Sequence, residues 1–325
     1  MVLMNRLFKP LLHLFSASVL VAGNAYAEAY PQRPVTIIVP FAAGSGTDII
    51  GRIVAEELGK KLGGSFIVDN KPGASGAIGS SAVARAKPDG YTLLITSSGT
   101  HSAAPWLVNK ISYDPKADFS HVTVLVEANY LLLVGETSPA KSLSEFVSYA
   151  ASKGDRLTYG YGSPTSQVLF AAFADLLGIH AEGIPYKSQP QTLTDLVGGR
   201  LDVAVADVPA AQPFVEGKKV RPLVISTSTR LSAVPTVPTL AESGYRPLGI
   251  SGWVGVAAPA GTPVEIVERL NAALKEIVNQ ENVSSRFLGM GLKPNYMSLD
   301  AVTAFVSSQL EAWGNYARKA GIKPE

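Results

Sequence analysis

The sequence predicts an α/β protein with two lobes, each built on a mostly parallel sheet flanked by helices. Short runs rich in β-branched residues alternate with segments of helical periodicity along most of the chain, which is typical of parallel strands joined by helices. Loops rich in glycine, serine and threonine follow several of these runs. The order strand, loop, helix also occurs in two successive sets of roughly 100 residues, the size of a small domain.

The first set begins with the β-branched run at residues 34–39, which ends at Pro40 and is typical of a buried strand. Behind a glycine-rich turn, Ile49, Ile53 and Leu62 recur at helical spacing. The strands expected in this set are residues 34–39, 66–68 and 91–96, and the expected helices are residues 49–62 and 78–86.

The second set begins with a strand at residues 130–134. Further strands are expected at residues 157–160, 181–184, 203–206, 220–225 and 251–257. Helices are expected at residues 143–152, 166–177, 264–278, 284–288 and 299–320. No short repeat or low-complexity tract interrupts this pattern, so nothing beyond the two lobes is predicted.

The first 27 residues have the pattern of a secretory signal peptide. Arg6 and Lys9 precede an apolar run at residues 11–22, and Ala25 and Ala27 form a small-x-small cleavage site. The run is too short to span a bilayer, which takes about 20 residues. The alternative is a buried N-terminal helix. We expect residues 1–27 to be a signal peptide, cleaved after Ala27, and the product to be exported to the periplasm.

Charge and cysteine content exclude several classes of function. Of 325 residues, 28 are Lys or Arg and 26 are Asp or Glu. Removing Arg6 and Lys9 with the signal peptide leaves 26 bases against 26 acids, and a neutral chain has no electrostatic footprint for nucleic acid. The absence of cysteine excludes disulfides, thiolate zinc sites and a cysteine nucleophile.

No motif for a cofactor, a metal or a catalytic centre is present. The sequence has no P-loop, no dinucleotide-binding glycine pattern, no zinc-protease motif and no nucleophile elbow. His101, His121 and His180 have no metal-ligand spacing. We therefore expect no cofactor, no metal and no catalytic residues.

Two chemically similar loops are the candidate ligand site. The loop at residues 41–48 and the loop at residues 159–167 each place glycines and hydroxyls just before a predicted helix. The free N–H groups and the dipole of a helix N-terminus favour an anion, and glycines let the backbone approach it closely. Two such loops facing each other would hold a carboxylate without Arg or Lys. The alternative for each loop is ordinary helix capping, because Ser, Thr and Asp are preferred caps.

Three further positions lie at the same edge of the predicted sheets. Asp207 follows a strand and precedes Pro209, so it is either a helix cap or a site residue. Ser97 and His101 lie in a loop that follows a strand, where a ligand contact is expected. Asp48 would repel an anion, which favours capping or a water-mediated role. The candidate ligand-binding residues are Phe41, Gly44, Ser45, Gly46, Thr47, Asp48, Ser97, His101, Tyr161, Gly162, Ser163, Thr165, Ser166 and Asp207.

Seven motifs in a fixed order resemble the Bug-type periplasmic solute receptors of tripartite tricarboxylate transporters. They include VPFAAGSGTD, NKPGA and KPDGYTLL near the N-terminus. The seven motifs are residues 39–48, 70–74, 87–94, 185–187, 203–209, 234–244 and 258–263. The resemblance covers residues 34–322. One departure is Gln167, which stands near a position where the family commonly has a histidine.

The resemblance implies a two-lobe Venus-flytrap binding protein that clasps a carboxylate between the two loops. Backbone N–H groups, hydroxyls and bridging waters would hold it. Hinges near Tyr130 and Ser251 would separate a first lobe of residues 28–130 plus 253–325 from a second lobe of residues 131–252.

The expected function is capture of a small organic acid, either a dicarboxylate or an aromatic carboxylate. The implied partners are this acid and the integral-membrane permease subunits of the transporter, and the receptor is expected to be a monomer. One alternative is a receptor that senses the acid for signalling. The other is a secreted serine hydrolase that uses a loop serine with His101 or His180.

Overall fold

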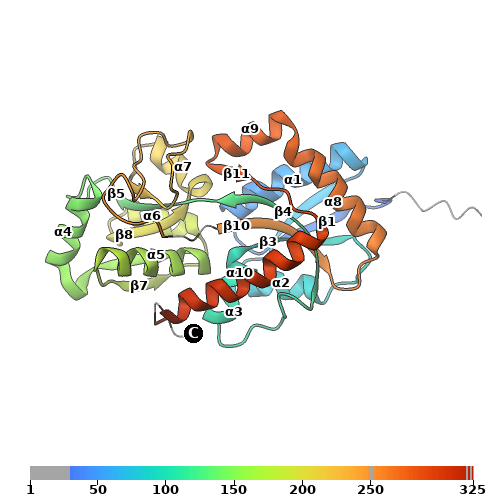
Figure 1. The fold of residues 1–325 in the computed structure, drawn as a ribbon, viewed down its shortest axis with the longest axis horizontal. Helices are drawn as coiled ribbons and strands as arrows, with labels where there is room; N and C mark the ends of the chain where they lie inside the picture. Colours follow the sequence, from blue (N-terminus) through green and yellow to red (C-terminus); the bar gives the residue numbers. More distant parts are fainter. Residues whose placement is uncertain (1–29, 249, 251, 320, 323, 325) are drawn as a thin grey trace, which may run out of the picture. The chain divides into compact units, whose positions relative to one another are not determined.

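The computed structural model describes residues 30–324 apart from 249, 251, 320 and 323 (Figure 1). The predicted signal peptide, residues 1–27, and the predicted hinge residue Ser251 lie outside the described residues. Within residues 31–325, which form one compact unit, the described strands make two sheets.

The first sheet has six strands in the order β11-β4-β10-β3-β1-β2. Their bounds are β1 Val35–Val39, β2 Phe66–Asn70, β3 Thr92–Ser97, β4 Phe119–Ala128, β10 Gly252–Pro259 and β11 Leu292–Pro294. β1 runs parallel to β2 and β3, whereas β10 and β11 pair antiparallel with their neighbours.

The second sheet has five strands in the order β7-β6-β8-β5-β9. Their bounds are β5 Tyr130–Gly135, β6 Thr158–Tyr161, β7 Glu182–Pro185, β8 Val203–Asp207 and β9 Val220–Ile225. β6 is parallel to β7 and β8, and β5 is antiparallel to β8 and β9.

Both sheets are mixed, which corrects the prediction of mostly parallel sheets. The parallel strands are those joined by loop–helix connections. In the second sheet the reversed strand is β5, the first strand after the chain leaves the first sheet, separated from β4 by Asn129 alone. The chain returns to the first sheet with β10. The direction of a strand relative to its neighbours depends on which sheet it joins, and alternating periodicity does not reveal that.

The helices agree with the prediction where the sequence periodicity is long. Their bounds are α1 Gly46–Leu62, α2 Ala77–Ala84, α3 Ala104–Leu107, α4 Leu143–Lys153, α5 Pro164–Leu177, α6 Gln189–Val197, α7 Val208–Glu216, α8 Val264–Asn279, α9 Glu281–Gly289 and α10 Leu299–Lys319. Shorter helical turns lie at Ala74–Gly76, Gly99–Ala103 and Gly154–Arg156. α3, α6, α7 and strands β4 and β11 were not predicted. No helix in the described part of the chain is long and apolar enough to cross a membrane.

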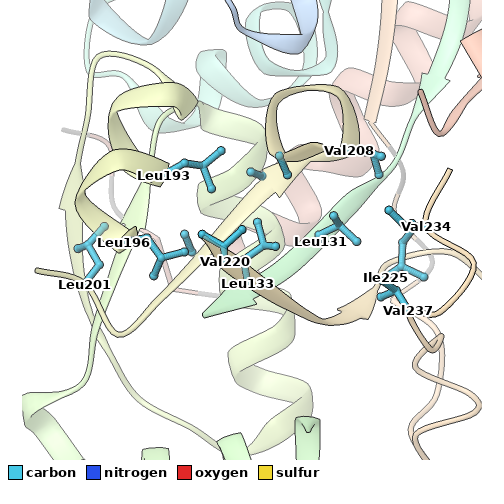
Figure 2. Close-up of a cluster of buried hydrophobic side chains, with 13 residues drawn as sticks. Leu131, Leu133, Leu193, Leu196, Leu201, Val208, Val220, Ile225, Val234 and Val237 are labelled. Atoms are coloured by element: carbon cyan, nitrogen blue, oxygen red, sulfur yellow. The ribbon is translucent and has the colours of Figure 1, made fainter. Parts of the chain in front are cut away.

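Helices α6 and α7 cover one face of the second sheet, and α5 lies against the other (Figure 1). Figure 2 shows the buried side chains between β5, β8 and the two helices, with Leu131 and Leu133 of β5 facing Leu193 and Leu196 of α6. Because strand side chains alternate between faces, Leu132 points away from this cluster. This apolar layer fixes the positions at which α6 and α7 begin, and both N-termini belong to the candidate site.

Candidate functional site

Four helix N-termini meet at one cavity. α1 follows β1, α5 follows β6, α6 follows β7 and α7 begins directly after β8. Each helix therefore starts beyond the carboxyl end of a strand, where open α/β sheets bind ligands. The first N–H groups of a helix have no acceptor within it, and four positive dipole ends directed at one space favour an anion.

The loop before α1 presents free donors at the cavity. The Ser45 hydroxyl caps the helix by accepting from the Asp48 N–H at 3.3 Å. The N–H groups of Gly46 and Thr47, in the first turn, are left without an intrahelical acceptor. Ser45, Gly46 and Thr47 all line the cavity, together with Phe41 from the same loop.

Asp48 stabilises this loop through hydrogen bonds and does not line the cavity. Its carboxylate accepts from the Gly44 N–H at 2.9 Å, from Arg52 at 3.0 Å and from the Asn70 amide at 2.9 Å. Burial alone would raise the pKa of Asp48, but these hydrogen bonds and the Arg52 charge outweigh it, so the pKa lies below its usual value. The predicted site residues Gly44 and Asp48 therefore stabilise the conformation of the loop and do not line the cavity.

The loop before α5 has a complete capping box. The Ser163 hydroxyl accepts from the Ser166 N–H, and the Ser166 hydroxyl accepts from the Ser163 N–H. Ser166 is fully buried, and its hydroxyl takes part in this capping box. Ser163 and Thr165 do line the cavity, and the Thr165 hydroxyl lies 3.1 Å from that of Ser98 after β3. This hydrogen bond joins the α5 loop to the end of a strand in the other sheet.

Asp207 is buried at the start of α7, where it caps the helix by accepting from the Ala210 N–H at 2.9 Å. Its own N–H donates to the Gln189 side chain at 2.8 Å. A Cβ added at Gly46 would overlap the Asp207 carboxylate, so that carboxylate packs against the first residue of α1. Burial raises the pKa of Asp207 to about 6, and the hydrogen bonds from Ala210 and Gln189 only partly offset the rise.

Nine of the predicted site residues line the cavity. They are Phe41, Ser45, Gly46, Thr47, Ser97, Gly162, Ser163, Thr165 and Asp207. Asp207 is the one charged residue among the described residues that line it, and no Lys or Arg does. The cavity is narrow, about 20 Å³, and roughly 10–15 Å³ is enough for one water. It suits a small polar head group that is held by neutral donors.

Five predicted residues lie elsewhere. Tyr161 lines a neighbouring hollow, and Gly44, Asp48 and Ser166 support the two loops, as described above. The prediction that His101 lies at the ligand site is wrong, because His101 does not line the cavity. The chain after β3 turns inward as Gly99–Ala103, which places His101 in the core at 0% exposure, with Nδ1 2.6 Å from the Thr96 hydroxyl. Burial lowers the pKa of His101 well below its usual value, so the ring is neutral.

Several lining residues were missed by the sequence interpretation. They are Ile50, Ala128, Tyr130, Ser188, Gln189, Pro209, Trp253, Val254 and Leu292. Ser188 was detectable, since Ser188 and Pro190 after a strand form the same helix-start signal as in the other loops. Tyr130 and Trp253 come from the strands on which the chain changes sheet, and no local motif marks them. No group of three His, Asp or Glu side chains able to hold a metal occurs in the described part of the chain.

The family is decided by a match along most of the chain. Residues 50–322 match the family described as "Tripartite tricarboxylate transporter family receptor". The chain belongs to this receptor family. The resemblance that seven sequence motifs predicted is thereby confirmed.

Solved structures of other receptors show the same architecture. This receptor is similar to R. palustris Rpa4515 with adipate, with a TM-score of 0.88 and 32% identity over 91% of this chain and 100% of that one. The periplasmic binding protein BugD has a TM-score of 0.86 and 30% identity over 91% and 100% of the two chains. MatC (Rpa3494) from Rhodopseudomonas palustris, with bound malate, has a TM-score of 0.83 and 34% identity over 88% and 99%. The predicted two-lobe periplasmic binding protein fold is confirmed.

Proposed function

We propose that this receptor captures one small organic acid, a dicarboxylate or an aromatic carboxylate, between its two lobes. The first lobe comprises residues 28–130 plus 253–325, and the second comprises residues 131–252. The receptor works in the periplasm as a monomer after cleavage behind Ala27. It delivers the acid to integral-membrane permease subunits and performs no catalysis. Family membership supports the delivery step, and relatives bound to adipate and malate support the class of ligand.

The observation that carries this proposal is the meeting of four helix N-termini at a cavity that is lined by no Lys or Arg among the described residues. One carboxylate of the acid lies between Ser45 and Thr47 of the α1 loop and Ser163 and Thr165 of the α5 loop. Hydrogen bonds to an ionised acceptor are roughly twice as strong as neutral ones. A few of them with apolar burial would give micromolar affinity, which corresponds to about −8 kcal/mol.

The first test is a thermal-shift screen with C3–C8 dicarboxylates, tricarboxylates, benzoate-type acids and acidic amino acids. A ligand at 100 times its Kd stabilises the folded state by about 2.7 kcal/mol, enough for a clear rise in Tm. The bound acid is then recovered and analysed by NMR, and the proposal requires it to be unchanged. A product, or no acid that raises Tm, would contradict the proposal.

The second test is Thr165→Val, which keeps the side-chain volume but removes the hydroxyl. Calorimetry should show affinity weakened by about tenfold, the loss expected for a charge-assisted hydrogen bond of about 1.5 kcal/mol. Thr303→Val is the matched control, since Thr303 is exposed on α10 and its hydroxyl donates to the Leu299 carbonyl. Equal affinity in the two variants would remove Thr165 from the site.

A further inference from the structure

A second hollow adjoins the cavity and is much roomier, at about 250 Å³. The two spaces share Phe41, Gly162 and Ser163 as lining residues. The inner cavity is lined by hydroxyls and helix N-termini and is narrow. The shared lining residues make the outer hollow the neighbouring space for the remaining atoms of a ligand whose head group occupies the inner cavity.

The outer hollow has a different chemistry from the inner cavity. Its walls include the aromatic residues Phe41, Tyr161 and Tyr186, and Lys187 is the one charged residue among the described residues that line it. Tyr186 is held in place because its hydroxyl donates to Asp195 at 2.9 Å. Lys187 is exposed, and no ion pair involves it within the described part of the chain. Apolar walls with one cation fit a hydrocarbon spacer that ends in an anion.

Residues 73–76, which also line the outer hollow, have an unusual backbone conformation. Four consecutive residues have positive φ: Gly73 at 126°, Ala74 at 46°, Ser75 at 56° and Gly76 at 89°. For Ala and Ser this left-handed conformation costs of order 1 kcal/mol each and persists only where the surroundings impose it. A Cβ at Gly76 would lie 3.2 Å from the Phe41 ring. The segment thus packs against Phe41, which lines both the inner cavity and the outer hollow.

We propose that the outer hollow is the subsite for the distal carboxylate of an extended dicarboxylate, with Lys187 as its counter-ion. This inference rests on the proposed function, because it takes the first carboxylate to lie at the helix N-termini. The inner site holds an anion without a cation, so Lys187 remains for the second charge. The rings of Phe41, Tyr161 and Tyr186 contact the carbon spacer. An acid with one carboxylate leaves Lys187 without its partner.

Isothermal titration calorimetry at low salt tests this with succinate, adipate and suberate, and with hexanoate and benzoate as monocarboxylates. Lys187→Gln should weaken adipate binding about two- to fivefold, the range of an exposed ion pair, and Lys187→Glu should weaken it further. Hexanoate affinity should be the same in all three proteins. Lys141→Gln, which removes an equally exposed charge before α4, is the control and should change neither affinity.

Each outcome separates the subsite from the proposed function. Adipate binding that is weakened by Lys187→Gln, with hexanoate unaffected, supports the subsite. Dicarboxylate binding that is indifferent to both Lys187 variants overturns the subsite and leaves the proposed function standing. Tighter binding of hexanoate or benzoate than of any dicarboxylate also overturns the subsite and leaves the proposed function standing. If none of the acids binds, both the subsite and the proposed function fail.

Discussion

The buried carboxylate at the start of α7 should make the receptor less stable at neutral pH than it would be without the charge. Asp207 has a pKa of about 6 in the folded protein, against an ordinary value of 3.8. The folded state therefore binds the proton more tightly than the unfolded state. The free energy of unfolding falls as the pH rises from 3.8 to about 6, and it remains at the lower value above that.

The size of the effect follows from the shift. A difference of about two units at 1.36 kcal/mol per unit amounts to about 3 kcal/mol at pH 8 and about 1.5 kcal/mol at pH 5. Asp207→Asn removes the charge but keeps an oxygen able to accept from the Ala210 N–H, and Asn is a preferred cap. The variant should be more stable than the wild type by up to these amounts.

Urea denaturation at pH 5 and pH 8 measures the difference between the two proteins. Groups other than Asp207 contribute equally to both and cancel. Asp114→Asn is the control: Asp114 is an exposed turn residue whose pKa is lowered by the N–H groups of Lys116 and Ala117, so its replacement should not stabilise the protein at pH 8. If Asp207→Asn is no more stable than the wild type at pH 8, or if its advantage is the same at both pH values, the reasoning is refuted.

Acid should destabilise the wild type through two neutral, buried histidines. Burial lowers the pKa of His121 to about 4 and that of His101 well below 6.5. The free energy of unfolding that these neutral histidines contribute is fully present above pH 6.5 and falls as the pH drops. For His121 alone the loss is about 2 kcal/mol at pH 5. His121→Asn should therefore lose less stability than the wild type between pH 7 and pH 5 in the same denaturation assay. Gly46→Ala should weaken acid binding at least tenfold by calorimetry, because its Cβ would overlap the Asp207 carboxylate. Gly289→Ala, on α9 with open space around it, should bind as the wild type does, and equal affinities for the two alanine variants would contradict the tight approach at Gly46.

The local sequence was sufficient to predict that the loops before α1 and α5 contribute residues to the candidate site. Ser45 and Ser163 were identified as helix-start residues behind strands, and the structure has both as side-chain caps at the cavity. The same signal at Ser188 was overlooked because α6 is only nine residues long, which leaves little periodicity to detect. A short helix is more visible from its cap than from its apolar pattern.

The remaining site residues could not be assigned from local sequence. Ser97 is the last residue of β3 and His101 lies four residues beyond it, yet Ser97 lines the cavity and His101 packs against Phe119 and His121 in the core. The direction of the turn between them depends on packing with α10, which lies about 200 residues further along the chain. Tyr130 reaches the cavity only because the chain changes sheet beside it, a consequence of tertiary structure.

The central claim is that a carboxylate is held by N–H groups at converging helix N-termini. The most direct measurement is a ¹⁵N–¹H NMR titration of the receptor with the tightest-binding acid and with its methyl ester. The largest amide shifts should occur at Gly46, Thr47 and Thr165, with strong downfield movement for the acid and little for the ester. Largest shifts at residues outside the four helix N-termini, or equal shifts with acid and ester, would contradict it.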